Sequence, residues 1–304
     1  MRFSIVTPVL NGERFLDQAI LSVVSQVGPF SIRYHVQDGG SKDATLEMLT
    51  AWKTRLATDF PIGCDRIEFS FATAPDQGVY DAVNRGFSAC GDSDIMAWIN
   101  SDDRFEPGAF VTVADIFDKY LDCDWVTGRP MVIAEDGAMF SYPTPVTPFP
   151  RQAIAAGIFD GRTARFIQQE GTFWRAGLWK KAGGLDANFR LAGDFDLWRR
   201  FAKHSDLVSV DAVLGGFRMR VGQLSANKAD YYAEIDASLS PEQMKTRAKS
   251  ARRFAKAGFS YQGLTRRYGE EWQRQISTIG ASSFLGAITL MVEDWCSVVM
   301  SMLP

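Results

Sequence analysis

The sequence has few of the residues that usually build thiol or imidazole sites. It holds only four cysteines and two histidines in 304 residues. The cysteines form no CxxC pair, which argues against a structural zinc site and favours reduced thiols in a cytoplasmic protein. Neither His35, inside a predicted strand, nor His204, at the end of a predicted helix, has a partner in the pattern, so both are expected to be structural. The cysteines are Cys64, Cys90, Cys123 and Cys296.

Long apolar runs and several well-known motifs are also missing. No run is long enough to span a bilayer, and the C-terminal candidate is broken by Glu293 and Asp294. The short apolar stretch after Arg2 ends at Pro8, so no secretory signal is expected. The net charge is only −3, which argues against a nucleic-acid binder. Without HExxH, GxSxG, GxGxxG or GxxxxGK[ST], zinc proteases, serine hydrolases, Rossmann dehydrogenases and P-loop NTPases are disfavoured.

What is present is an alternation of short apolar runs and helical patterns in a chain that is 46% hydrophobic. This alternation predicts an α/β fold with a mainly parallel, Rossmann-like sheet flanked by helices. Ligands of such sheets bind beyond the carboxyl ends of the strands. Residues 125–161 are less regular and suggest short strands and a loop. Strands are expected over 3–6, 34–36, 67–72 and 95–99, and helices over 14–26, 44–56, 79–89 and 195–203.

After residue 230 the character changes. Ser240 to Gln243 has the form of a capping box with Pro241 at the first helical position. Residues 241–280 hold nine Lys or Arg and three Glu, which gives this segment a charge of about +6. We therefore expect one domain over 1–230 and a helical extension over 231–304. An apolar stripe is expected at Met244, Ala248, Ala251, Ala255 and Phe259, and a last helix with an apolar face at Leu285, Ile288, Val292, Trp295 and Val299.

The strongest local signal for chemistry is the quartet 100–103, Asn-Ser-Asp-Asp. Asp102 and Asp103 directly follow a buried strand, and charge beside a core strand is costly unless it is compensated. A hard divalent cation, Mg²⁺ or Mn²⁺, would compensate it, because it binds carboxylate and phosphate oxygens. A solvated turn before the helix that starts near Pro107 explains the quartet equally well.

Four other segments carry polar residues at strand or helix ends. Residues 7–13 and 37–43 each end a strand, and the glycines of the second let a ligand approach the backbone. In residues 76–86, Arg85 suits a phosphate or a neighbouring acid. In residues 193–200, Asp194 shares a helix face with core-type residues, so it is expected to point inward as a candidate base. Each segment also reads as an ordinary turn or helix cap, with Asp43 and Asp194 as N-caps.

Taken in order, these segments resemble the family 2 glycosyltransferases with the GT-A fold, over roughly residues 3 to 226. The resemblance rests on the joint order and spacing of its motifs, each of which is weak alone. The motifs are Ser4-Ile5-Val6-Thr7-Pro8-Val9-Leu10-Asn11, Asp38-Gly39-Gly40-Ser41-Lys42-Asp43-Ala44-Thr45, Asp76 to Gly86, Asn100 to Asp103, Gln169 to Trp174, Gly183-Gly184-Leu185-Asp186 and Gly193 to Trp198.

The resemblance implies a role for each motif. Asp103 would ligate the metal that bridges the diphosphate, and Asp194 matches the usual base. Gln169, Glu170 and Trp174 would face the acceptor. The residues expected to bind the nucleotide are Thr7, Pro8, Val9, Glu13, Asp38, Gly39, Asp76, Asn84, Asp102, Arg218 and Arg220.

Two departures from the family pattern stand out. Gly193 replaces the glutamate that precedes the base in relatives, which removes one supporting element. Arg220 stands where relatives often have histidine. An arginine cannot ligate a metal but can neutralise diphosphate charge, so Arg218 and Arg220 are expected to share that work with the cation.

The implied activity is inverting transfer of a sugar from a UDP- or GDP-linked donor to a hydroxyl of a glycan or lipid-linked acceptor. Polysaccharide or lipopolysaccharide biosynthesis is the usual setting of relatives. A catalytically silent nucleotide- or glycan-binding module and a sugar nucleotidyltransferase are the alternatives, although no GxGTR-like loop follows the first strand. Residues 240–304 suggest contact with the inner face of the membrane, or else packing on the first domain or on another subunit of a homo-oligomer.

Overall fold

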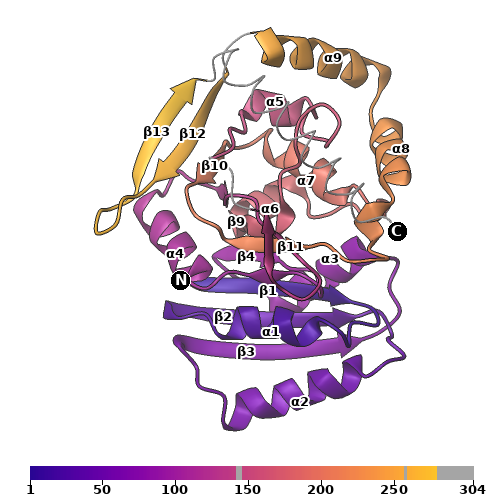
Figure 1. The fold of residues 1–304 in the computed structure, drawn as a ribbon, viewed down its shortest axis with the longest axis vertical. Helices are drawn as coiled ribbons and strands as arrows, with labels where there is room; N and C mark the ends of the chain where they lie inside the picture. The colour runs from indigo at the N-terminus through magenta and orange to yellow at the C-terminus, as the bar shows by residue number, and fades with distance from the viewer. Residues whose placement is uncertain (142–145, 257–258, 279–304) are drawn as a thin grey trace.

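The computed structural model describes residues 1–141, 146–256 and 259–278 (Figure 1). Its centre is a nine-stranded sheet with the order β13-β12-β10-β6-β9-β4-β1-β2-β3. The first half of the chain supplies β1 (Arg2–Val9), β2 (Gly28–Asp38), β3 (Cys64–Thr73) and β4 (Ile95–Trp98), which pair in parallel. Helices α1 (Leu16–Val24), α2 (Thr45–Thr58) and α3 (Val79–Cys90) connect them. The predicted alternation and the α/β class are therefore confirmed.

The middle of the chain adds three strands to the large sheet and forms a second, smaller sheet. Strand β9 (Thr172–Arg175) runs antiparallel between β4 and β6 (Trp125–Thr127), and β10 (Leu207–Val210) pairs in parallel with β6. The smaller sheet has the order β5-β11-β7-β8. It consists of β5 (Arg104–Phe105), β11 (Gly215–Arg218), β7 (Val132–Ile133) and β8 (Met139–Ser141).

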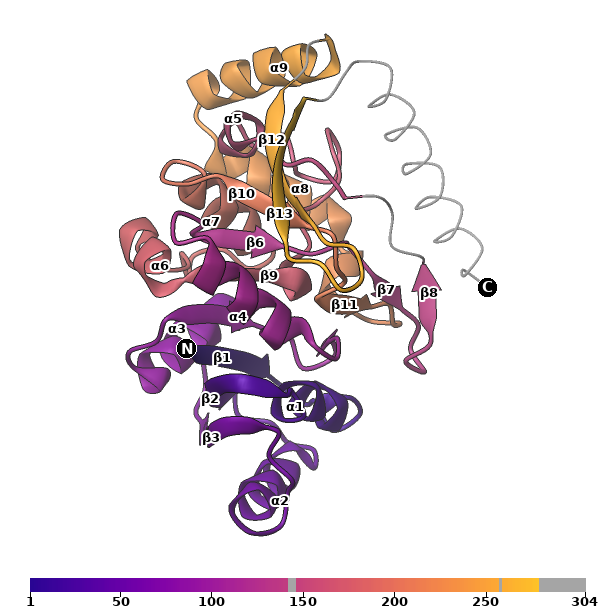
Figure 2. The same cartoon turned by 90° about the vertical axis from the view of Figure 1, so that its left-hand side faces the viewer.

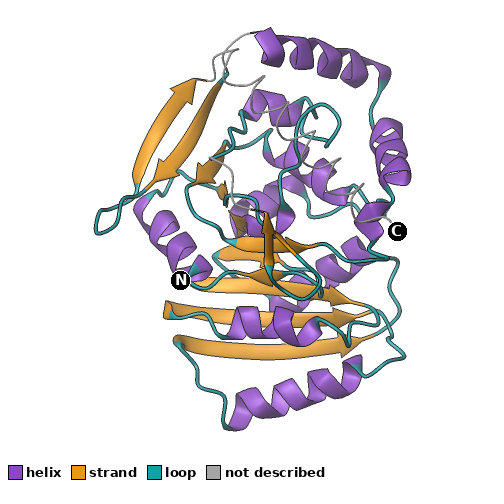
Figure 3. Ribbon diagram, viewed as in Figure 1, coloured by secondary structure: helices purple, strands orange, loops and turns teal. Residues whose placement is uncertain are grey.

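The remaining helices surround these sheets (Figure 3). Helix α7 follows the loop after α6 and carries the predicted Asp194, so the expected helix near 195–203 is confirmed. The bounds are α4 (Ala109–Lys119), α5 (Arg151–Ala155), α6 (Ala176–Ala182), α7 (Gly193–Phe201), α8 (Lys228–Ser238) and α9 (Pro241–Lys256), with short 3₁₀ turns η1 (Gln169–Gly171) and η2 (Leu224–Ala226).

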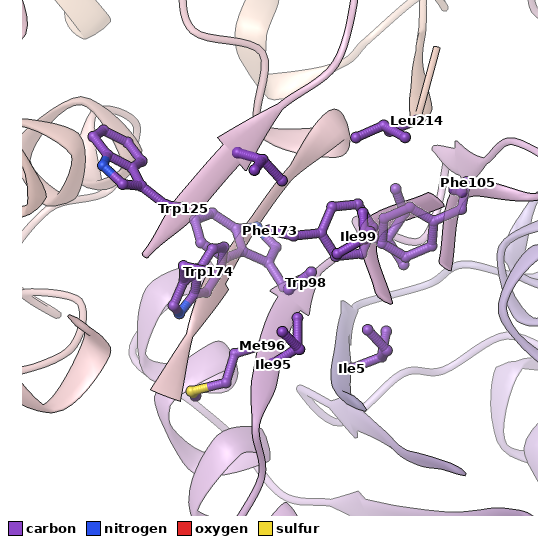
Figure 4. Close-up of a cluster of buried hydrophobic side chains, with 14 of the residues drawn as sticks. Ile5, Ile95, Met96, Trp98, Ile99, Phe105, Trp125, Phe173, Trp174 and Leu214 are labelled. Carbon is purple, nitrogen blue, oxygen red and sulfur yellow. The ribbon is translucent and has the colours of Figure 1, made fainter. Parts of the chain in front are cut away.

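Aromatic side chains form a large part of the core around β4, β6 and β9 (Figure 4). Trp98 of β4, Trp125 of β6 and Trp174 of β9 are buried together, and Trp198 of α7 stacks on the first two at 5.9 Å and 5.7 Å between ring centroids. On the neighbouring strands, α3 lies so close to β1 that a Cβ on Gly86 would be 2.5 Å from the Cγ1 atom of Val6. Only glycine permits that approach.

The C-terminal segment differs from the expected run of helices. Residues after α9 form a hairpin, β12 (Ser260–Thr265) and β13 (Gln273–Thr278), and β12 pairs in parallel with β10 at the edge of the large sheet (Figure 2). The hairpin therefore extends the sheet that the first 230 residues build. The division of the chain at residue 230 stays a prediction, and the predicted last helix lies outside the described residues.

Helix α9 begins with the predicted capping box, since Ser240 N–H donates to Gln243 Oε1 and Gln243 N–H donates to Ser240 Oγ. The predicted apolar stripe is only partly confirmed, since Met244 and Ala248 are exposed whereas Ala251 packs against the core and Phe259 is buried beyond the helix. Arg247 and Phe254 also lie on the inward side of α9. Within the described ranges, no helix is both long and apolar enough to cross a membrane.

Candidate active site

The carboxyl ends of β1, β2 and β4 meet at one edge of the sheet. Val9 is in register with Asp38, and the N–H of Gly39 donates to the carbonyl of Val9 at 2.9 Å. The turn after β4, which holds Asp102 and Asp103, starts beside the same end of β1, because the N–H of Ile99 bonds to the carbonyl of Val6. The predicted motifs of these strands therefore come together in space.

Asp103 forms a buried acid pair with Glu170 of η1. Asp103 is 1% exposed and Glu170 4%, and their carboxyl groups are hydrogen-bonded to each other. The N–H of Arg218 and the amide of Asn100 also donate to Asp103, at 2.7 Å and 3.1 Å. Burial, together with the charges of Glu170 and Asp102, raises the pKa of Asp103 well above its ordinary value. Burial also raises the pKa of Glu170, to about 7.

This pair is the part of the structure whose chemistry fits a divalent cation. Two buried carboxyl groups share one site, and Arg218 N–H and Asn100 are neutral donors that offset only part of their charge. Hard carboxylate oxygens are what Mg²⁺ and Mn²⁺ prefer, with substrate phosphate oxygens completing the shell. No cluster of three or more His, Cys, Asp or Glu suited to a metal occurs among the residues that the structure describes. A cation here would therefore depend on oxygens from the substrate.

The two arginines of β11 and its end have different surroundings. Arg220 is part-exposed and its Nε donates to Asp102 Oδ2 at 2.7 Å, so it lies at the rim of the acidic turn. Arg218 is 1% exposed, and its guanidinium donates to the backbone carbonyls of Asp102, Ala134 and Glu135 and to Gln18. The prediction that Arg218 faces a diphosphate is wrong, because its guanidinium already ties the smaller sheet to the turn.

The residues after β2 are arranged around Asp38. This side chain is buried and accepts hydrogen bonds from the N–H and hydroxyl of Ser41. A Cβ on Gly39 would lie 2.8 Å from the Oδ2 atom of Asp76, so the loop before α3 approaches the loop after β2. Asp38, Gly39 and Asp76 therefore line one corner of the sheet edge.

Glu13 and Asp43 link the two strand-end loops. Glu13 N–H donates to Asp43, and the N–H of Ala44 donates to Glu13. The N-cap residue of α2 is Ala44 rather than the expected Asp43, which instead accepts from the N–H of Thr45. Glu13 is accordingly engaged in holding the start of α2.

The other residues predicted to contact the nucleotide have side chains that are buried or already hydrogen-bonded. Thr7, Pro8 and Val9 are buried in β1, and the hydroxyl of Thr7 bonds to that of Tyr34 at 2.9 Å, so only backbone from this segment is left for a ligand. Asn84 is not free to bind a nucleotide, because its amide donates to the carbonyl of Leu185 and accepts from the N–H of Leu185. Arg85 pairs with its neighbour Asp81.

All three residues predicted to face the acceptor are buried, and two of them belong to the core rather than to the site. Trp174 is 0% exposed, with its ring 5.5 Å from that of Trp98 and 5.8 Å from that of Trp198, so it belongs to the core. Gln169 is buried and donates to the carbonyl of Trp98, which anchors η1 to β4. Glu170 alone of the three has its side chain in the site.

Asp194 lies in the first turn of α7 on its inner side, as the helical spacing predicts. Its Oδ1 atom is buried and has no hydrogen-bond partner within the described residues. Burial raises the pKa of Asp194 to about 6, and the charge of Glu234 adds to the rise. The charge of Asp194 in turn raises the pKa of Glu170, which connects the two acids electrostatically.

Two residues beside Asp194 were missed by the sequence reasoning. The hydroxyl of Tyr80 donates to the carbonyl of Leu191 at 2.7 Å, and Glu234 of α8 accepts from the backbone of residues 190–192. Tyr80 is within the motif 76–86 but has no polar pattern of its own. Glu234 is 40 residues from Asp194 and lies beyond the motifs, so no local signal points to it.

The comparisons with known proteins agree with this geometry. The family model described as "Glycosyl transferase family 2" matches residues 4–161, just over half of the chain. A "PGL/p-HBAD biosynthesis glycosyltransferase" of Mycobacterium bovis is 26% identical over 211 residues, which cover 68% of this chain and 72% of the relative. An uncharacterised glycosyltransferase of Mycobacterium tuberculosis is 25% identical over 217 residues, covering 70% of this chain and 74% of that protein.

Solved structures show the same fold. S. aureus TarS 1-349 in complex with UDP-GlcNAc superposes with a TM-score of 0.59 at 15% identity, over 84% of this chain and 73% of TarS 1-349. Its complex with UDP gives a TM-score of 0.55 over 83% and 71% of the two chains. The match of the family model, the named relatives and the shared fold lead to one conclusion. The chain belongs to glycosyl transferase family 2 and is a glycosyltransferase with the GT-A fold.

Proposed function

We propose that this glycosyltransferase moves a sugar from a uridine diphosphate-linked donor to a hydroxyl group, with inversion at the anomeric carbon, and requires Mn²⁺ or Mg²⁺. The observation that carries the proposal is the presence of two different acidic environments that interact electrostatically. Asp194 has a buried, unpaired carboxyl oxygen, while Asp103 and Glu170 form a buried pair of hard oxygen donors. The uridine donor is supported by TarS 1-349, whose structures contain UDP-GlcNAc and UDP.

The residues around the site divide the work of the reaction. Asp103 and Glu170 would hold the cation, which supplies Lewis-acid stabilisation of the departing diphosphate. Arg220, at the rim of the acidic turn beside Asp102, adds positive charge toward the same phosphate oxygens. Asp38, Gly39 and Asp76 would bind the nucleoside at the corner they line.

Asp194 acts as the general base that accepts the proton of the acceptor hydroxyl. Its buried Oδ1 has no partner in the described part of the chain and would accept that proton, and its pKa of about 6 lets it be ionised near neutral pH. General-base catalysis of this kind supplies about 10²–10⁴-fold in rate.

The first test is a thermal-shift panel of UDP, GDP, dTDP and CMP, each with and without Mn²⁺. A ligand at about 100 times its Kd adds about 2.7 kcal/mol to the free energy of unfolding, which is a visible shift. We expect a manganese-dependent shift with UDP that Asp103→Ala abolishes. A shift with GDP alone would indicate a GDP-linked donor instead of a UDP-linked one. No shift with any nucleotide would contradict the proposal.

For the acceptor we propose a glycan or a lipid-linked glycan. We also propose that the enzyme is cytoplasmic and binds the membrane surface peripherally. The membrane contact is supported by the outer face of α9, where Lys245, Lys249, Arg252 and Arg253 are exposed. Basic faces of this kind bind anionic lipid surfaces. Flotation with liposomes of phosphatidylglycerol and phosphatidylcholine, with these four residues changed to Gln as the control, tests it. Equal flotation of both proteins would leave packing as the role of α9.

A further inference from the structure

The loop that leads into α7 is held by a carboxylate from the C-terminal part of the chain. Glu234 of α8 accepts three hydrogen bonds from consecutive backbone N–H groups. They are those of Arg190 at 2.6 Å, Leu191 at 2.8 Å and Ala192 at 2.7 Å. Hydrogen bonds from several backbone N–H groups to one carboxylate are among the strongest that a protein makes. The last of these residues, Ala192, immediately precedes α7.

Apolar contacts keep α8 in that position. Ile235, next to Glu234, is 0% exposed and clusters with Leu239, with Ala192 of the loop and with Phe195 of α7. The carboxylate is therefore presented by a packed helix rather than by a free side chain. Its contact with the loop is a fixed part of the fold.

The same loop is held from its other side by α3. The hydroxyl of Tyr80 donates to the carbonyl of Leu191. A Cβ atom on Gly193 would lie 2.6 Å from the Tyr80 ring, so no side chain fits at residue 193. Tyr80 thus fills the space beside the position where the sequence departs from its relatives, and support for Asp194 must come from elsewhere.

Asp194 depends on this loop for its position. It lies two residues after Ala192, and its Oδ1 atom has no partner of its own in the described part of the chain. The charged and titratable groups that face it are Tyr80 from α3, Glu170 from η1, and Tyr231 and Glu234 from α8. Burial raises the pKa of both tyrosines, so they are neutral near neutral pH, whereas the charge of Glu234 raises the pKa of Asp194.

We propose that Glu234 is a positioning residue for Asp194, which fixes the loop 190–192 and supplies from α8 the acidic support that Gly193 cannot. Its position in α8 makes the C-terminal part of the chain a contributor to the active site. The catalytic consequence rests on the proposed function, but the structural part does not.

The test compares Glu234→Gln with the matched control Glu242→Gln, the same chemical change at an exposed position of α9. Amide hydrogen exchange at residues 190–192 is expected to accelerate by about tenfold or more in Glu234→Gln and to stay unchanged in the control. The pKa of Asp194, measured from the ¹³Cγ shift of Asp-labelled protein and assigned with Asp194→Asn, is expected to fall by about one unit. Unchanged exchange or an unchanged pKa would overturn the proposal.

Kinetics supply a third readout. Transfer is followed by the release of UDP from the UDP-sugar donor. The kcat of Glu234→Gln should be about tenfold to a hundredfold lower than that of the wild-type protein, with KM for the donor nearly unchanged. A rise in KM alone would overturn the positioning role. If the wild-type protein transfers no sugar, the proposed function fails, while exchange and the Asp194 pKa still decide this inference. If Glu234→Gln does not fold, Glu234→Asp keeps the charge, shortens the reach, and should also accelerate exchange at 190–192.

Discussion

Among single residues, the acidic side chains of the site differ in their surroundings. Asp194 keeps a buried oxygen that has no hydrogen-bond partner among the residues the structure describes, whereas Asp103 and Glu170 are bonded to each other and to neutral donors. Asp102, at the rim, is paired with Arg220 instead. Such differences assign distinct tasks to chemically similar groups, as in other enzymes that use several carboxylates.

Asp194→Asn should abolish transfer while leaving the donor bound. The amide cannot take a proton, so kcat is expected to fall by about 10²–10⁴-fold. In the wild-type protein the base must be ionised, so transfer should rise with pH through about 6, the pKa of Asp194. Calorimetric binding of UDP and a pH profile of transfer measure the two effects. Transfer by Asp194→Asn at a comparable rate would remove Asp194 from the mechanism.

The acid pair should make the metal-free protein less stable as pH rises. The folded state raises the pKa of Glu170 from its ordinary value of 4.5 to about 7, so its contribution to stability is complete below 4.5 and is lost as pH rises through 7. Asp103 acts in the same direction. Melting temperatures in EDTA between pH 4.5 and 8 measure this slope. Glu170→Gln should flatten it, whereas Glu47→Gln, exposed on α2, should leave it as it is.

At the scale of elements, the position of Glu170 depends on how closely β11 passes η1. A Cβ on Gly215 would lie 2.1 Å from the carbonyl oxygen of Glu170, a backbone atom that has little room to move. A Cβ on Gly216 would instead meet the terminal methyl of Met131, at 2.5 Å, and that flexible side chain can shift. A side chain is therefore accommodated more easily at residue 216 than at residue 215.

Gly215→Ala is expected to cost about 1–3 kcal/mol of stability and to weaken the manganese-dependent UDP shift, because η1 must move away from β11. Gly216→Ala is the matched control and should leave the nucleotide shift intact. Urea unfolding and the thermal-shift assay measure the two effects. Equal behaviour of the two variants would show that the approach of β11 does not position Glu170.

The elements also show what could be predicted from sequence. The strands and helices of residues 2–98 have clear periodicity, and the structure confirms them. The strand β12 was missed because Ser260–Thr265 is short and polar, and it becomes a strand by pairing with β10, whose residues lie 54 positions earlier. Trp174 was misplaced for a related reason. An aromatic ring suits a sugar or a core equally well, and only the packing of β9 between two strands decides it.

At the scale of the whole molecule, the C-terminal segment is joined to the rest through the sheet and through the loop before α7. Strand β12 pairs with β10, Arg247 of α9 forms an ion pair with the fully buried Asp160, and Glu234 holds residues 190–192. These contacts predict that residues 1–278 unfold as one cooperative unit.

Leu264→Ala tests that cooperativity. Leu264 in β12 is 0% exposed, so its truncation should cost about 2–5 kcal/mol and shift the entire urea transition. Ile276→Ala in β13, where the side chain is 74% exposed, is the matched control and should change stability by less than about 0.5 kcal/mol. Tryptophan fluorescence and circular dichroism should report the same midpoint. Two separated transitions would mean that the segment after residue 230 folds by itself.

The tryptophan cluster behind the site gives the protein an optical signature. Trp98, Trp125, Trp174, Trp179 and Trp198, five of the eight tryptophans, lie in a chain of ring contacts with centroids 5.5–5.9 Å apart. Indoles this close couple electronically, so their near-ultraviolet circular dichroism depends on mutual orientation. Trp198 shares α7 with Asp194, and a shift of that helix on ligand binding would therefore change the spectrum without any added label.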